Sequence, residues 1–383
     1  MKIGVMLRHL GQPGGIGVYT SNIVESLLQV DRSNEYFFLY QHEDQLQHFP
    51  DYPNATEVVL HSKSKLGWDQ ITVPLFARRN GIDLLYNPKL SVPLITQSKT
   101  VLVMHGAEQF AVPHAFKWHD RIYFSIANRL YVRRADSIIA MTNMGAKDIS
   151  RYMHADPRKI SVIPESYNER CRVLERQQLL AVKEKYSLPD QFILFVGGLN
   201  PIKNFRNLLR AYRLVRNQSL HKLVVVGFKR WGVSDDLQLI TQLGLDNDVV
   251  FPGYLPDEDI PAMYGLADAF VFPSLYEGFG MPVLEAMACA CPVITTKRGC
   301  SPEVAGDAAI LVDPEDPNEI AMAVQRVLND DALSMQLVER GLERVRQFSW
   351  EKCARETLAV LEAVGSRART NPTTVVTSTP FQR

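Results

Sequence analysis

The chain has 383 residues, a length that excludes one small core and suits two domains of roughly 150–200 residues each. Lys plus Arg and Asp plus Glu both number 42, so the formal net charge is zero and no overall field recruits nucleic acid. The five cysteines form no C-x-x-C pair with matching histidines, which argues against a zinc site or a disulfide framework and favours a reducing cytoplasm. Because no run of about 18 apolar residues occurs, we expect no membrane-spanning helix.

The first half alternates short apolar runs with amphipathic stretches. The runs that we expect to form buried strands are 3–7, 36–40, 83–88, 100–105, 136–141 and 160–164. Amphipathic segments such as 18–30 and 121–135 lie between them, and strands that alternate with helices indicate a parallel α/β sheet. Residues 1–170 are therefore predicted to form one Rossmann-like domain.

A charged, helix-prone segment at 171–190 interrupts this pattern, and we interpret it as the interdomain connection. The strand pattern then restarts at 192–198, 222–227, 248–253, 268–274, 292–296 and 308–314. Residues 191–350 are predicted to form a second doubly wound domain. Residues 351–365 predict a C-terminal helix, for which packing back on the first domain is one arrangement. The polar, Thr/Pro-rich residues 366–383 predict a disordered tail.

Ligands of open parallel sheets bind outside the carboxyl ends of the strands, so the strand-to-helix loops are the places to search for a site. In the first such loop, Gly14, Gly15 and Gly17 allow the backbone to approach an anion at a helix N-terminus. Thr20 takes the third position of a dinucleotide fingerprint, which argues against NAD binding. A flexible turn without a ligand also explains these glycines.

The second loop, VGGLNPIKN, follows the strand at 192–198 and precedes an amphipathic helix. Lys203 lies beside the predicted start of that helix, where its charge and the helix dipole would both attract phosphate. A solvated lysine is the alternative. The loop has no Walker A motif, so a P-loop ATPase is not supported.

The third loop has the sequence YEGFGMPVLE and leads into a helix that Pro282 is suited to begin. We predict Glu285 in the first turn, where opposing the helix dipole by roughly 0.3–1 kcal/mol would explain it structurally. Glu277 has no such explanation. Its carboxylate could accept hydrogen bonds from sugar hydroxyls, while the amides of Phe279 and Gly280 could hold phosphate. The loop therefore suits a ligand that carries both hydroxyls and phosphate.

His105 ends the predicted strand at 100–105, either as a structural residue or as a group facing the cleft. Five segments carry a resemblance to a known family: EGFGMPVLE, VGGLNPIKN, the glycine-rich first loop, the MHG at His105 and PEVAGDAAILVDP. Together they resemble the family-four (group 1) retaining, nucleotide-sugar-dependent glycosyltransferases. The resemblance covers about residues 1–360 and is closest to the bacterial mannosyltransferase-like branch. It implies the GT-B fold, an α/β architecture of two Rossmann-like doubly wound parallel-sheet domains that face a cleft.

The resemblance also implies the roles of the site residues. Glu277 would hold the hydroxyls of the donor sugar, Glu285 would bind the ribose, and Lys203 would neutralise the departing diphosphate. His105 would face the transferred sugar. Further donor contacts are implied for Gly14, Gly15, Gly17, Arg206, Gly227, Tyr254, Gly278, Phe279, Gly280, Met281 and Pro282. No cofactor and no metal are expected, because Lys203 and the helix N-terminus supply positive charge.

The chain departs from the family pattern in two places. Many relatives have an arginine where this chain has Gly198, and Arg206 either replaces it or is simply solvated. Relatives often have a Pro-Asn-Gly turn where this chain has the sequence IPESYNE at 163–169. These departures bear on the phosphate geometry and on residue assignments in that turn.

The resemblance predicts retaining transfer of a hexose, first of all mannose from GDP-mannose, to a glycan or lipid-linked acceptor in polysaccharide or cell-envelope synthesis. The alternatives are a sugar-nucleotide epimerase or phosphorylase on the same fold, or a non-catalytic nucleotide-sugar-binding protein. We expect a cytoplasmic protein, with peripheral membrane contact through 121–135 as a further option. In that segment Ile122, Ile126 and Leu130 recur every four residues among arginines. Packing of these three residues on the helix's own sheet is the interpretation we favour.

Overall fold

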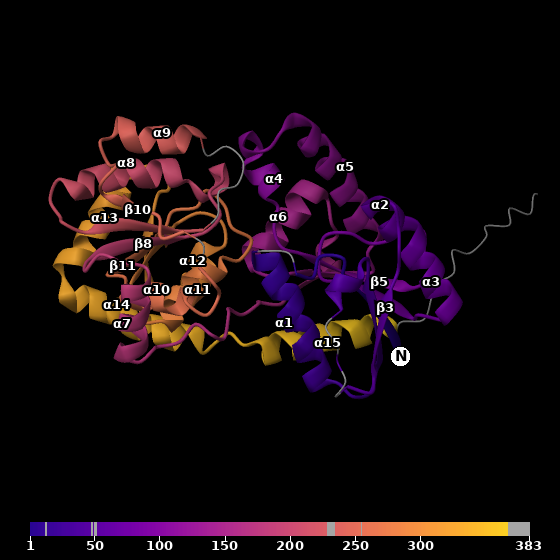
Figure 1. Ribbon diagram of the computed structural model, residues 1–383. Helices are drawn as coiled ribbons and strands as arrows, with labels where there is room; N and C mark the ends of the chain where they lie inside the picture. The colour runs from indigo at the N-terminus through magenta and orange to yellow at the C-terminus, as the bar shows by residue number, and fades with distance from the viewer. Residues whose placement is uncertain (12–13, 47–48, 50–51, 228–233, 254, 367–383) are drawn as a thin grey trace, which may run out of the picture.

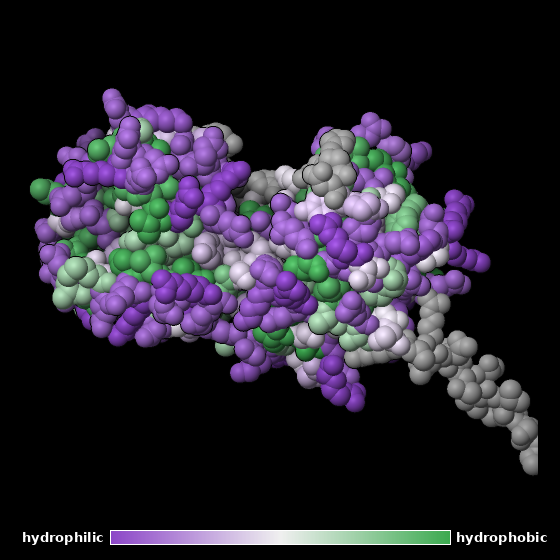
Figure 2. Space-filling view, turned by 90° about the horizontal axis from the view of Figure 1, so that it is seen from below, coloured by the Kyte–Doolittle hydropathy of each residue, from purple (hydrophilic) through white to green (hydrophobic). Residues whose placement is uncertain are grey.

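The computed structural model describes residues 1–11, 14–46, 49, 52–227, 234–253 and 255–366. The chain forms two lobes, each built on a parallel sheet with helices on its faces (Figure 1). In space-filling view the two lobes lie side by side and meet at a narrower waist (Figure 2). This is the predicted doubly wound α/β architecture.

The first sheet has seven strands in the order β3-β2-β1-β4-β5-β6-β7. Its strands are β1 (Lys2–Met6), β2 (Glu35–Tyr40), β3 (Ala55–Val59), β4 (Leu84–Asn87), β5 (Lys99–Met104), β6 (Ser137–Ala140) and β7 (Ile160–Val162). The six predicted strands are confirmed, and β3 was missed. Its sequence ATEVV contains Thr56 and Glu57 and is only partly buried, so it lacks the continuous apolar run of the others.

The second sheet has six strands in the order β10-β9-β8-β11-β12-β13. Its strands are β8 (Phe192–Val196), β9 (Lys222–Val226), β10 (Val249–Val250), β11 (Ala269–Phe272), β12 (Val293–Thr296) and β13 (Ala309–Val312). All six strand predictions are confirmed in place, although β10 is much shorter than the predicted 248–253. The strand order reverses between β1 and β4 and between β8 and β11, and loops at such switch points form ligand sites.

The helices of the first lobe are α1 (Gly15–Val30), α2 (Lys65–Gly67), α3 (Val73–Asn80), α4 (Glu108–Ala111), α5 (Trp118–Arg134) and α6 (Asn143–Met153). Those that follow are α7 (Arg176–Lys185), α8 (Phe205–Arg216), α9 (Ser234–Gln242), α10 (Ile260–Leu266), α11 (Met281–Ala288), α12 (Ser301–Ala305), α13 (Pro317–Asn329), α14 (Asp331–Val345) and α15 (Trp350–Gly365). Single 3₁₀ turns occur at Glu43–Gln45, Pro113–Ala115, Pro157–Lys159 and Pro201–Lys203, and a π-helical turn at Trp68–Thr72.

Helix α15 returns from the second lobe and packs beside α1 of the first (Figure 1). Its first residue, Trp350, donates its indole N–H to the carbonyl oxygen of Tyr167 at 2.9 Å. The Trp350 ring also meets the Tyr19 ring of α1 edge to face, at 5.8 Å between centroids. Helix α15 therefore joins the two lobes at a second place besides the connection after β7.

Helix α5 corrects one expectation. Its buried residues are Asn128, Tyr131 and Val132, whereas Ile122, Ile126 and Leu130 are 53%, 59% and 45% exposed. Packing on the sheet therefore does not explain these three apolar residues, because the helix turns its opposite side to the core. Among the described residues, no helix combines the length and the apolarity needed to cross a membrane.

Candidate active site

The centre of the site is a contact between the loops that follow β8 and β11. The ammonium group of Lys203 lies 2.7 and 3.0 Å from the two carboxylate oxygens of Glu277. Lys203 ends a 3₁₀ turn whose N–H groups bond to the Asn200 side chain, and its ammonium group lies 4.7 Å from the centre of the Phe272 ring. The residues predicted to hold phosphate and sugar therefore lie in direct contact at the switch point of the second sheet, and each neutralises the other.

Glycines allow loops of the first lobe to pack closely against the loop that carries Glu277. A Cβ atom added to Gly278 would lie 1.4 Å from the carbonyl oxygen of His105, and one added to Gly15 would lie 2.8 Å from the Met281 methyl group. The loops after β5 and β1 thus touch the loop that follows β11. Three predicted site regions that are far apart in sequence therefore meet in one interlobe contact.

The remaining glycines of the site shape its loops. Gly14 has a positive φ and caps α1, whose first turn contains Gly17. Gly227 also has a positive φ, and a Cβ there would lie 2.1 Å from the carbonyl oxygen of Gly197. Gly280 has φ 94° and allows the chain to turn into α11. Positive φ favours glycine at both positions, and at Gly227 a side chain would also collide with the backbone of Gly197.

Helix α11 begins at Met281, with Pro282 in its first turn as predicted. Phe279 is buried just before this helix. The carbonyl oxygen of Phe279 accepts a hydrogen bond from the Cys300 thiol. Tyr254 lies outside the described residues. The N-terminus of α11 therefore starts directly beside Glu277, where a phosphate group would meet it.

His105 presents its main chain to the cleft contact and turns its ring into the first lobe. Its Nε2 atom lies 2.8 Å from the carbonyl oxygen of Pro88, and the edge of the Tyr19 ring packs against the imidazole. Burial lowers the pKa of His105 to about 4. The imidazole is therefore neutral at physiological pH.

Two buried or partly buried carboxyl groups at the cleft were missed. Glu165, in the IPESYNE turn after β7, is buried, and its Oε2 atom lacks a hydrogen-bond partner 3.9 Å from His105 Nδ1. Burial raises its pKa. Burial also raises the pKa of Glu108 at the start of α4, and the charge of Glu277 adds to this effect. Their only sequence signal was their position in the loops that follow the carboxyl ends of β7 and β5.

Glu285 corrects a second expectation. It is the fifth residue of α11, whose first turn contains no acidic residue, so the helix dipole does not explain it. It accepts a hydrogen bond from the Tyr264 hydroxyl at 3.1 Å. Burial nevertheless raises the pKa of Glu285 to about 7. A carboxyl group that is costly to ionise in the folded protein indicates a functional role more than a structural one.

We expect Glu285→Gln to stabilise the protein at pH 8, by at most about 3 kcal/mol, because the native carboxyl titrates near pH 7 and the unfolded one near 4.5. Well below pH 4.5 the carboxyl is protonated in both the folded and the unfolded state, so it does not lower the free energy of unfolding. As pH rises from there, the unfolded state loses the proton first, so the penalty grows until about pH 7. Urea unfolding of both proteins at pH 5 and pH 8 measures this difference. An equal gain at both pH values would contradict the assignment.

Polar contacts between the lobes surround the site. The Tyr276 hydroxyl donates to Asp148 of α6 at 2.9 Å and accepts from the backbone N–H of Ala107 at 3.1 Å. The Glu303 carboxylate of α12 accepts from two backbone N–H groups and the Asn143 amide at the start of α6. These bonds hold the two lobes together around the loops of the site.

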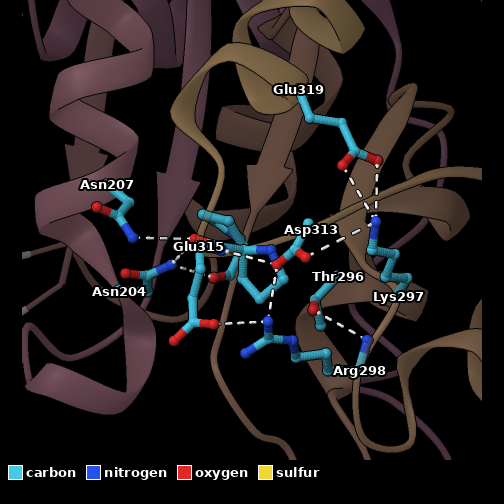
Figure 3. Close-up of polar contacts among 10 residues, drawn as sticks. Asn204, Asn207, Thr296, Lys297, Arg298, Asp313, Glu315 and Glu319 are labelled. Atoms are coloured by element: carbon cyan, nitrogen blue, oxygen red, sulfur yellow. Dashed lines mark hydrogen bonds and ion pairs between the residues drawn. The ribbon is translucent and has the colours of Figure 1, made fainter.

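Basic side chains near the site already have acidic partners. Arg206 lies 3.2 Å from Asp236 of α9. Figure 3 shows Arg298 bonded to both Asp313 and Glu315, at 3.0 and 2.6 Å. Lys203 and Arg206 thus point to different carboxylates.

A cavity of about 310 Å³ lies between the lobes beside Tyr276. The charged residues in its lining include Asp148, Arg298 and Glu315, and Tyr152 supplies an aromatic ring. Within the described ranges, no group of three or more acidic, histidine or cysteine side chains is arranged to hold a metal ion.

Comparison with known proteins agrees with this geometry. Residues 178–344 match the family "Glycosyl transferases group 1", and residues 13–169 match "Glycosyltransferase Family 4". The O-antigen chain mannosyltransferase B of Escherichia coli is 31% identical over 290 residues, which cover 74% of this chain and 75% of that protein. The MMP alpha-(1->4)-mannosyltransferase of Mycolicibacterium hassiacum is 27% identical over 75% of this chain and 69% of its own length.

Solved structures share the whole architecture. Sucrose-phosphate synthase from Thermosynechococcus elongatus superposes with a TM-score of 0.77 at 21% identity, over 95% of this chain and 98% of that one. Anabaena HepE, in complex with UDP and glucose, gives 0.77 at 20% identity over 95% and 100%. The chain belongs to the group 1 glycosyltransferases, in the mannosyltransferase-like branch, and has the GT-B fold. It is therefore a glycosyltransferase. This membership favours glycosyl transfer over the activity of an epimerase or a phosphorylase and over a purely binding role.

Proposed function

We propose that this enzyme transfers a hexose, with mannose as the first choice, from a nucleoside diphosphate sugar to a glycan or lipid-linked acceptor, with retention of configuration. The observation that carries the proposal is the Lys203–Glu277 pair at the switch point of the second sheet, covered by the loop of His105. The names of its mannosyltransferase relatives support mannose. The complex of HepE with UDP and glucose supports a nucleotide-sugar donor.

The geometry suggests how the donor is held. A diphosphate beside the α11 N-terminus would take Lys203 as its counter-ion. The sugar hydroxyls would then donate hydrogen bonds to the carboxylate of Glu277. Lys203 thereby exchanges one anion for another, so its charge becomes available where the leaving group develops negative charge. Glu285, on the next turn of α11, would accept hydrogen bonds from the ribose hydroxyls. Because Lys203 and the helix end supply positive charge, we propose that no metal or cofactor is needed.

Transfer would proceed on the face from which the diphosphate leaves. The acceptor oxygen forms a bond to the anomeric carbon as the bond from that carbon to the diphosphate oxygen breaks. The proton of the acceptor hydroxyl passes to the departing phosphate oxygen. Catalysis then depends on positioning and on stabilising the developing diphosphate charge, with Glu277 as an orienting group.

The interlobe cavity beside Tyr276 is our proposed position for the acceptor. Tyr152 lines this cavity, with Phe110 stacked on its ring at 5.8 Å and the Arg151 guanidinium 5.3 Å from the ring centre. Asp148 and Glu315 offer carboxylates to the hydroxyls of the acceptor. All five cysteines are buried without a disulfide, which supports a cytoplasmic site of action.

The test is a donor screen followed by analysis of the product. We expect one nucleotide sugar to raise the melting temperature most, because ligand binding stabilises the native state. With that donor and a glycan acceptor, NMR should show that the anomeric configuration of the donor is kept in the product. An inverted linkage would disprove retention, and donor binding without transfer to any acceptor would disprove the proposed activity.

A further inference from the structure

One face of α5 carries large apolar side chains that the fold leaves uncovered. Trp118, Ile122, Ile126 and Leu130 follow each other every four residues and are 72%, 53%, 59% and 45% exposed. Residues at this spacing lie on the same side of a helix. Since the core side of α5 is occupied by other residues, the apolar side faces solvent along the whole helix.

Two other segments extend this surface. Ile95 is 86% exposed in the loop before β5, and Arg134 at the end of α5 donates hydrogen bonds to the carbonyl oxygens of Leu94 and Thr96. The same loop is bonded to Gln70, which accepts from the Leu94 N–H at 2.8 Å. Gln70 is followed by exposed Ile71. We call the exposed apolar residues of α5, Leu94, Ile95 and Ile71 the α5 surface.

Figure 1 shows where these elements lie. Helices α2, α3 and α5 are all on the first lobe, with α2 and α3 at its end remote from the second lobe. The start of α5 approaches the cleft, because the turn Pro113–Ala115 that precedes it packs against Tyr276. The α5 surface therefore extends from the neighbourhood of the active site to the outer end of the lobe.

The charge around this surface is one-sided. Exposed basic residues of the two helical regions include Lys65, Arg79, Lys117, Arg121, Arg129 and Arg133. The acidic residues of the same regions, 63–80 and 117–134, are Asp69 and Asp120, and Asp69 is buried in an ion pair with Arg8. The whole chain is neutral, so this positive charge is a local feature.

Arg129 and Arg133 lie on the apolar side of α5 itself. Arg129 follows Ile126 by three residues and Ile122 by seven, and Arg133 follows Ile126 by seven. Long arginine side chains can place their charge at lipid headgroups while their stems cover apolar surface, and tryptophan is enriched at the same depth. A protein partner would have to bury these charges, whereas an anionic bilayer satisfies both features at once.

We propose that the α5 surface binds an anionic lipid bilayer and holds the enzyme peripherally on it. The apolar stripe enters the boundary between headgroups and acyl chains, and the basic residues contact the headgroups. This orientation places the Pro113–Ala115 turn, and with it the interlobe cavity that His114 lines, near the membrane, where a lipid-linked acceptor would be found. Binding of the surface does not depend on transfer, so the two proposals can fail separately.

The test is flotation of the full-length protein, without donor, on vesicles of phosphatidylcholine with or without phosphatidylglycerol. We expect binding to vesicles that contain phosphatidylglycerol and roughly tenfold weaker binding in high salt. The variants Ile122→Ser/Ile126→Ser and Arg129→Glu/Arg133→Glu should each lower binding by about tenfold or more. Their melting temperatures and donor affinities should stay unchanged.

Matched controls lie on the second lobe. Met322 on α13 and Met335 on α14 are 57% and 66% exposed, and Arg326 on α13 and Arg346 directly after α14 are exposed as well. The corresponding Met→Ser and Arg→Glu double variants should bind as the wild type does. The proposal is overturned if the wild type does not float with anionic vesicles, or if the α5 variants bind as well as these controls. It is also overturned if light scattering shows a dimer that Ile122→Ser/Ile126→Ser converts to a monomer, because the surface would then join two copies of the chain.

Discussion

Gly278→Ala is expected to lower the rate of transfer by about 100-fold or more while both lobes remain folded. The new methyl group would lie 1.4 Å from the carbonyl oxygen of His105 and 2.6 Å from its carbon. Both are backbone atoms of the other lobe, so neither can move aside as a flexible side chain would. Gly278 is not among the residues with positive φ, and alanine therefore strains nothing within its own loop. The methyl group acts only by keeping the lobes apart.

The measurements are kcat, the affinity for the donor, and the radius of gyration from X-ray scattering. Lys203, Glu277 and Glu285 all belong to the second lobe, so donor binding should fall less than kcat. Gly265→Ala is the matched control, because its nearest neighbour is the flexible end of the Leu179 side chain. Full activity of Gly278→Ala would show that this interlobe contact is not needed for transfer.

Glu277→Gln should lower kcat by roughly two to three orders of magnitude, because the group that orients the donor sugar loses its charge. The variant also leaves Lys203 without the carboxylate that lies 2.7 Å away. A nucleoside diphosphate without a sugar should consequently bind as tightly as before, or more tightly. Lys203→Met should weaken that binding instead.

Isothermal titration with the nucleoside diphosphate and steady-state kinetics with the nucleotide sugar separate these effects. Glu319→Gln is the matched control, since Glu319 also pairs with a lysine, Lys297 at 3.1 Å, but on the surface of the second lobe (Figure 3). Its kinetics should equal those of the wild type. If Glu277→Gln were fully active, the assignment of the donor-sugar site would be wrong.

Only some residues of the site could be predicted from the sequence alone. Lys203 and Glu277 were predictable because each lies in the loop that follows an apolar strand, and the strand-to-helix loops of a parallel sheet lie at one edge. Glu165 and Glu108 also follow strands, but nothing in their spacing shows burial or an unsatisfied carboxylate. For Glu285, position in the helix suggested a structural explanation, and only the buried surroundings showed that ionising it is costly.

The sequence by itself determined the order of the elements and the place of every strand but one, because hydrophobic periodicity acts over a few neighbouring residues. It missed β3, where Glu57 breaks the apolar run. Only the tertiary structure decided which faces are covered. The spacing of Ile122 and Ile126 defines a stripe on α5 but cannot say whether that stripe meets a sheet or water. Likewise, the approach of Gly278 to His105 depends on how two separately folded lobes pack, which no local pattern encodes.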